Sequence, residues 1–92
     1  MSKVRVPTQL RTLTGGASEV AVDGSTVAEV LKALDAAHPG FAERLFDEKG
    51  SLRRFVNVFV GDEDVRFLQN LETPVTEGQT VSIVPAVAGG AG

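Results

Sequence analysis

Residues 80–92 read Thr80-Val81-Ser82-Ile83-Val84, then Pro85-Ala86-Val87-Ala88, and finally Gly89-Gly90-Ala91-Gly92. The first five alternate with a period of two, which places Val81 and Ile83 on one face and is typical of a half-buried strand. Pro85 has no amide hydrogen to donate, so strand pairing should end near it. We therefore predict a folded domain over residues 1–84, followed by a flexible C-terminal tail over residues 85–92.

The tail offers little apolar area to bury, and chain ends without an anchor fray. Residues 85–90 span roughly 20 Å when extended, at about 3.3 Å per residue. Gly89 and Gly90 lack a Cβ atom, so the backbone of another protein can close around them. Such a tail suits insertion into a narrow active site of a partner, although a glycine-rich end taken alone is more typical of a linker or a frayed terminus.

Composition indicates one small globular domain. The chain has 92 residues, 42% of them hydrophobic and 23% charged, and a net charge of −3 at pH 7. This acidic balance argues against nucleic acid as a partner. The absence of cysteine excludes disulfides, thiolate catalysis and cysteine-based metal sites. Neither a signal peptide nor an apolar run long enough to cross a membrane is recognisable, so we expect a cytoplasmic protein without membrane contacts.

The first half of the chain predicts a hairpin followed by a helix. Residues 3–6 and 19–23 alternate as strands do, and the turn residues 14–17 lie between them. Thr26 and Glu29 fit a capping box at the start of a helix that should end by Ala37. The apolar residues of this helix share one face, because they are spaced at i, i+3, i+4 and i+7: Val27, Val30, Leu31 and Leu34.

The second half predicts a short helical turn over residues 41–46 and the strongest strand over residues 54–60. A second hairpin should bring in residues 65–67, and residues 68–75 should be irregular, anchored by Leu71. The order β-β-α-β-β-β then predicts an α+β fold, the ubiquitin-like β-grasp: a mixed sheet of four to five strands packed on one main helix. The last strand is expected at the sheet centre, parallel to the first.

No group of side chains suggests catalysis, and we predict that the protein is not an enzyme. His38, the only histidine, falls in a His-Pro-Gly turn, where it is more typical of a helix end than of a base. The carboxylates of residues 62–64 are adjacent, which is not the spaced ligand set of a calcium loop. We expect them at a solvated hairpin tip and predict no metal site.

One strand carries a candidate docking surface. If the three valines of residues 56–60 meet the helix, Phe55 and Phe59 lie on the open face of the sheet. An exposed apolar patch often marks a binding site, which makes these two residues candidate partner contacts. The alternative is that the loop of residues 68–75 covers them.

Three stretches together resemble the ThiS/MoaD family of ubiquitin-like sulfur carrier proteins, and within it the carriers that serve cysteine biosynthesis. They are Val6-Pro7-Thr8-Gln9-Leu10-Arg11 with Thr14-Gly15-Gly16; Arg54-Phe55-Val56-Asn57-Val58-Phe59-Val60 with Asp62-Glu63-Asp64-Val65-Arg66-Phe67; and Val81-Ser82-Ile83-Val84-Pro85-Ala86-Val87-Ala88-Gly89-Gly90. These stretches span nearly the whole chain.

The resemblance implies that the α-carboxylate of Gly90, preceded by Gly89, is the functional group. A ubiquitin-activating-enzyme-like (MoeB/ThiF-type) partner would adenylate it with ATP and magnesium, and sulfur would then displace AMP to leave a thiocarboxylate. The carrier itself would bind no cofactor. A cysteine synthase-like enzyme would accept the sulfur, and a JAMM-type metalloprotease would release the product. Pro85 and Val87 join the implied partner contacts.

The chain departs from this family at Ala91 and Gly92, because the family's mature tail ends at the second glycine. We therefore expect a processing site between Gly90 and Ala91. Three alternatives remain open: sulfur donation to molybdopterin or thiamine, transfer of the activated tail to a target lysine as a ubiquitin-like modifier, and a plain β-grasp binding module that uses the two phenylalanines.

Overall fold

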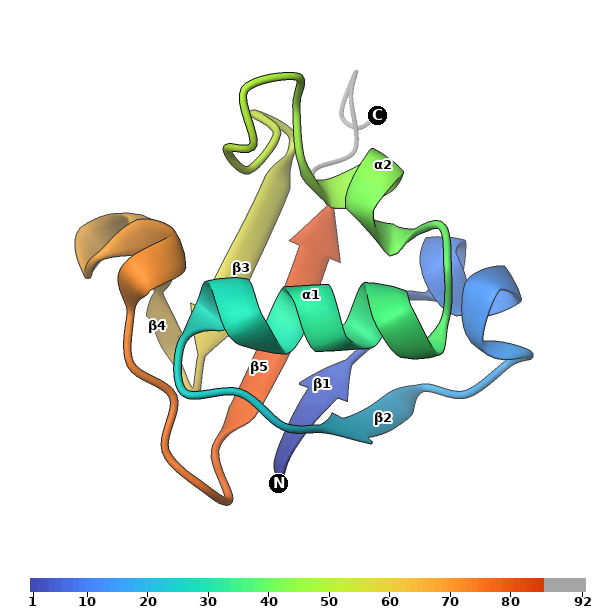
Figure 1. Ribbon diagram of the computed structural model, residues 1–92, viewed down its shortest axis with the longest axis horizontal. Helices are drawn as coiled ribbons and strands as arrows, with labels where there is room; N and C mark the ends of the chain where they lie inside the picture. The colour runs from blue at the N-terminus through green and yellow to red at the C-terminus, as the bar shows by residue number, and fades with distance from the viewer. Residues whose placement is uncertain (86–92) are drawn as a thin grey trace.

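The computed structural model describes residues 1–85. Five strands form a single sheet, and two α-helices and three 3₁₀ helices (η) connect them (Figure 1). In chain order the elements are β1 (Ser2–Arg5), η1 (Thr8–Thr14), β2 (Glu19–Val22), α1 (Val27–Ala37), α2 (Phe41–Leu45), β3 (Val56–Val60), β4 (Glu63–Asp64), η2 (Val65–Phe67), η3 (Asn70–Glu72) and β5 (Thr80–Pro85).

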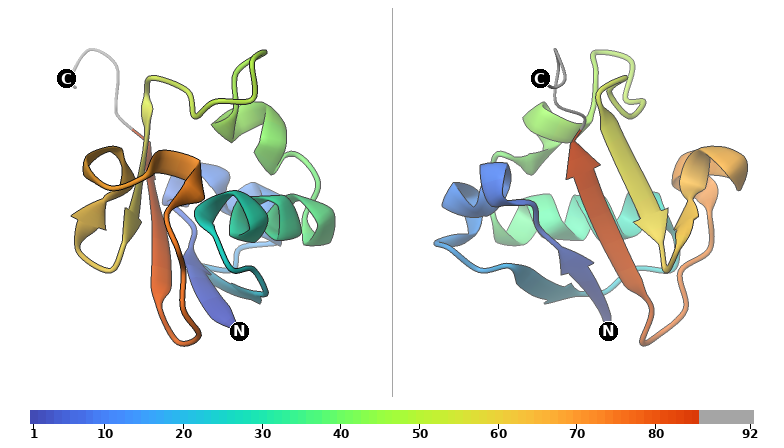
Figure 2. Two further views of the ribbon diagram at one scale, coloured as in Figure 1. Left: turned by 60° about the vertical axis from the view of Figure 1, so that its left-hand side comes forward. Right: turned by 180° about the vertical axis from the view of Figure 1, so that it is seen from behind.

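The sheet has the strand order β2-β1-β5-β3-β4. β1 and β5 are parallel at its centre, with Val4 opposite Val81, and every other pair of neighbours is antiparallel. Helix α1 crosses one face of this sheet, and among residues 1–85 no α-helix covers the other face (Figure 2). The predicted β-grasp is therefore confirmed, including the parallel pairing of the first and last strands.

The core lies between α1 and the sheet, as the two periodicities predict. Every second residue of β3 is buried, and Val58 is completely inaccessible. The four apolar residues of the predicted helix face are all fully buried: Val27, Val30, Leu31 and Leu34. Phe41 and Leu45 of α2 close the same core. Burial of these side chains supplies most of the driving force for folding.

Helix α1 begins where the capping pattern places it. The Thr26 hydroxyl accepts a hydrogen bond from the Glu29 amide at 3.2 Å. The Glu29 carboxylate reaches back one residue further than the standard capping box, and accepts from the Ser25 amide at 2.8 Å. The helix ends at Ala37, before the His-Pro-Gly sequence, as expected.

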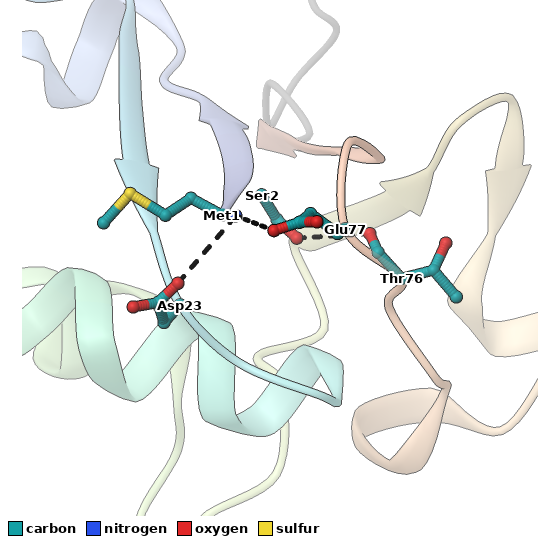
Figure 3. A network of polar contacts seen from close by, with 5 residues as sticks. All are labelled: Met1, Ser2, Asp23, Thr76 and Glu77. Carbon is teal, nitrogen blue, oxygen red and sulfur yellow. Dashed lines mark hydrogen bonds and ion pairs between the residues drawn. The ribbon is translucent and has the colours of Figure 1, made fainter.

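A network of polar contacts lies at the end of the sheet where β1 begins (Figure 3). The amino group of Met1 donates to the Glu77 carboxylate at 3.1 Å and lies 3.9 Å from a carboxylate oxygen of Asp23. The Ser2 hydroxyl donates to the Thr76 carbonyl at 3.4 Å. The two contacts of the Met1 amino group are exposed and add little stability, whereas Ser2 is buried. Together they join the loop before β5 to the start of β1.

The antiparallel pairing of β1 with β2 and the turn within residues 14–17 are confirmed, and η1 occupies the connection before that turn. Two local predictions are wrong. The second hairpin strand is Glu63–Asp64, and Val65–Phe67 is helical because the Asp64 carboxylate accepts from the Arg66 amide at 2.8 Å. The strongest strand begins at Val56, two residues later than expected.

Candidate functional site

The candidate site begins where β5 delivers the chain to its last residues. Pro85 ends β5 and pairs with Val56 at the start of β3. β1 ends at Arg5, opposite Ser82, so the last three residues of β5 have a neighbouring strand on one side only. The chain thus leaves the centre of the sheet at the end opposite Met1. The predicted functional residues beyond this point lie outside the described residues: Val87, Gly89, Gly90, Ala91 and Gly92.

Of the two predicted aromatic contacts, Phe59 lies in β3 on the open face, and Phe55 lies in the turn just before β3. Phe55 is 59% exposed, and the loop of residues 68–75 does not cover it. Phe59 is half-buried, opposite Ser82. Val84, which is 44% exposed, lies opposite Asn57 and thus between the two rings along the strand direction. Phe59 and Val84 share the open face beside the root of the tail, and Phe55 is exposed just before β3; the role of these residues as partner contacts stays a prediction.

Arg66 holds the backbone that carries Phe55, a role that the sequence did not indicate. Its guanidinium Nη2 donates to the carbonyl oxygens of Arg53 at 3.3 Å, Arg54 at 3.1 Å and Val56 at 2.9 Å. A guanidinium is suited to such a role, because it is always charged and carries several donors in fixed directions. The side chain from η2 therefore fixes the approach to β3, and with it the position of the Phe55 ring.

Pro85, the remaining predicted contact, is half-buried and lines a groove of about 440 Å³, called the tail-root groove below. Its walls come from the end of β1, the start of η1 and the last residues of β5. The lining residues are Arg5, Val6, Pro7, Thr8, Gln9, Arg11, Ser82, Ile83, Val84 and Pro85. The sequence pattern did not reveal this groove, because it joins segments that are more than seventy residues apart.

The residues set aside during the sequence analysis lie apart from the exit. His38 is half-buried at the C-terminal cap of α1. Asp62 lies in the turn before β4, and Glu63 and Asp64 form β4 itself at the sheet edge, so the acidic run is only partly a hairpin tip. Within residues 1–85, no three histidine or carboxylate side chains gather in a way that would hold a metal ion.

A family model described as ThiS family matches residues 4–90, from the first strand to the second glycine of the tail. The chain belongs to the ThiS family. Among curated relatives, the sulfur carrier protein CysO of Mycobacterium tuberculosis is 48% identical over 89 residues, which cover 95% of this chain and 96% of that protein. The small archaeal modifier protein 3 of Haloferax volcanii is 38% identical over 74% of this chain and 73% of its own.

Solved structures agree with this membership in the ThiS family. A chain in the crystal structure of the Amycolatopsis orientalis BexX/CysO complex superposes with a TM-score of 0.92 at 47% identity, and the match covers 97% of this chain and 99% of that one. Relatives named as sulfur carriers thus match this ThiS-family chain nearly from end to end. Among the described residues, no helix has the length and apolar character needed to cross a membrane.

Proposed function

We propose that this protein is a cytoplasmic sulfur carrier for cysteine biosynthesis and that it works through a thiocarboxylate at Gly90. One observation carries the proposal: 48% identity to the sulfur carrier protein CysO over 95% of the chain. The fold supports it, because the central strand β5 ends at Pro85, directly before the residues that would carry the chemistry. The family match also ends at Gly90, and leaves Ala91 and Gly92 outside.

The chemistry follows from the weakness of a carboxylate as an electrophile. The activating enzyme transfers the AMP moiety of ATP to the Gly90 carboxylate, and pyrophosphate leaves with magnesium. A sulfur nucleophile then attacks the acyl carbon, the bond to AMP breaks, and a thiocarboxylate remains. Because the sulfur is mounted on the main chain, the carrier needs no cysteine side chain, and the sequence contains none.

In the next steps the thiocarboxylate sulfur bonds to Cβ of an activated serine on a cysteine synthase-like enzyme, and the bond from Cβ to the activated serine oxygen breaks, so that this oxygen leaves with its activating group. An S-to-N acyl shift gives a carrier–cysteine adduct, and a metal-dependent protease hydrolyses the new peptide bond after Gly90. The carrier is a substrate in each step, and its partners supply the catalysis. Phe55, Phe59 and Val84 offer these partners an apolar surface beside the root of the tail.

The two residues after Gly90 make the chain a precursor in this scheme, since adenylation requires a free carboxylate. The same kind of protease removes Ala91 and Gly92, because both cuts fall after Gly90. The residues from Ala86 to Gly92 carry only small side chains, which lets a protease bind them without unfolding the domain.

Intact mass spectrometry tests this proposal on two forms of the protein, the full chain and a chain that ends at Gly90. With the activating enzyme, ATP and a sulfur donor, the shorter form should gain the mass that results when one sulfur replaces one oxygen. The full chain should react only after incubation with the protease. A chain that ends at Ala88 is the control. A thiocarboxylate on the full chain, with Ala91 and Gly92 still present, would assign the reactive carboxylate to Gly92.

A second function is favoured by the similarity to the small archaeal modifier protein 3. In a modifier the activated carboxylate passes to a lysine amine of another protein, and an isopeptide bond forms. The same activation mixture, supplied with cell extract, distinguishes the two functions. Conjugates of higher mass that carry this chain on target lysines would establish that it is a protein modifier. Sulfur transfer to a serine-derived acceptor would establish that it is a sulfur carrier.

A further inference from the structure

The tail-root groove is cationic, although the whole chain is acidic. Arg5 and Arg11 are the charged residues among its lining, and no carboxylate lines it within residues 1–85. Arg5 is 68% exposed, and it lies 4.0 Å from the Glu19 carboxylate, at the outer limit of an ion pair. An exposed pair at that separation contributes little, so the Arg5 guanidinium is available to an anionic partner.

The groove is formed where β1 ends before its parallel neighbour β5. β1 turns away at Pro7 while β5 continues for three residues, which leaves an open strand edge along Ile83–Pro85. Arg11 Nε donates to the Val6 carbonyl at 3.1 Å and so holds its guanidinium at the rim. In the described part of the chain, the side chains of Thr8 and Gln9 make no hydrogen bond, which leaves further donors on the wall.

Arginine side chains gather at the end of the sheet from which the tail leaves, and carboxylates lie there as well. At the exit end, Arg53 and Arg54 are exposed before β3, across β5 from the groove. At the opposite end, the exposed carboxylates include Asp23 and Glu77 beside Met1, and Glu63 at the sheet edge. At the exit end, however, Glu19 lies 4.0 Å from Arg5, and Asp47 and Glu48 lie near Arg53, so the positive charge is local to the groove.

We propose that the tail-root groove binds an acidic, extended segment of the activating enzyme and so aligns the tail as it enters the active site. The inference rests on the proposed function, since it assigns a docking surface for that partner. The open edge of β5 favours an extended segment, because such an edge pairs with a strand. Two guanidinium groups with no carboxylate between them favour acidic side chains on that segment.

Adenylation kinetics on the chain that ends at Gly90 test the inference. Arg11→Glu should raise the KM for the carrier roughly tenfold and change kcat much less, because a docking contact acts before the chemical step. Arg11→Lys keeps the charge and should recover most of the loss. Lys32→Glu reverses one charge in the same way at an exposed position of α1. It is the matched control and should leave KM unchanged. If Arg11→Glu does not fold, Arg5→Glu replaces it, because Arg5 is exposed on a strand.

Salt and nucleotide measurements complete the test. The difference between Arg11→Glu and the parent should shrink toward 1 M salt, where the Debye length falls to about 3 Å. Equal KM values for Arg11→Glu and Lys32→Glu would overturn the inference and leave the proposed function intact. A rise in the KM for ATP instead would also overturn it, because the groove would then serve the nucleotide. A parent chain that is never adenylated would overturn the proposed function and this inference with it.

Discussion

Replacement of Leu31 by alanine should destabilise the domain severely. Leu31 is the middle residue of the buried face of α1, and none of its side-chain surface is accessible. It belongs to the one cluster of buried residues that joins the helix to all four long strands. Because α1 is the only long helix among residues 1–85, few other side chains can move to fill the space that the substitution leaves.

The expected loss can be worked out from this burial. Leu31→Ala removes three carbon atoms, at about 0.8 kcal/mol for each buried methylene, which gives roughly 2.4 kcal/mol for transfer alone. A cavity that does not collapse adds to this term, so we expect a total loss of about 2.5–5 kcal/mol. For a domain of this size, each kcal/mol lowers Tm by roughly 4–8 °C. The variant should therefore melt at least about 10 °C below the parent.

Thermal and urea unfolding, followed by circular dichroism, provide the measurement. Lys32→Ala is the matched control, because it lies on the exposed side of the same helix and should change the free energy of unfolding by no more than about 0.5 kcal/mol. An unchanged m-value would show that the same surface is exposed on unfolding. If Leu31→Ala and Lys32→Ala melt together, the assignment of the buried helix face is wrong.

Two further substitutions test the open face and a close backbone contact. Phe59→Glu should weaken binding to the activating enzyme or the synthase. It should change Tm little, because Phe59 is half-buried on the face of the sheet opposite α1. If this variant unfolds, Phe59 belongs to the core and does not serve docking. Gly24→Ala should cost about 1–3 kcal/mol in thermal melts, because its Cβ would lie 2.6 Å from the Val30 amide nitrogen. Ser25→Ala, which alters an exposed neighbour, is the control, and an equal Tm for both variants would contradict the close contact.

Local periodicity carried much of the prediction of the fold. The alternation in β3 and β5 correctly assigned valines and Ile83 to the core, and the spacing in α1 correctly assigned Leu31 and Leu34. The same alternation correctly placed Phe59 on the open face, whereas Phe55 lies in the turn before the strand, where alternation no longer assigns a face. These inferences succeed because the pitch of a helix and the pleat of a strand dictate which residues share a face, whatever the rest of the chain does.

Tertiary structure decided the features that depend on residues far apart in the sequence. Arg66 reaches the carbonyl groups before β3 only because β4 and η2 fold back beside them. The tail-root groove exists only because β1 ends three residues before β5, its parallel neighbour. The sequence pattern alone predicts that Val65–Phe67 is extended. The segment is a 3₁₀ helix instead, because the Asp64 carboxylate accepts a hydrogen bond from the Arg66 amide.

The sequence by itself determined that Pro85 is followed by residues with little apolar area and by two glycines without a Cβ atom, because these properties depend on no neighbour in the fold. Only the tertiary structure decided what surrounds the exit of that tail. Placing Arg5, Arg11 and Val84 around the end of β5 requires the parallel pairing of the first and last strands, which closes a loop of more than seventy residues. Such a contact is set by the packing of the whole core, and no local pattern in either strand encodes it.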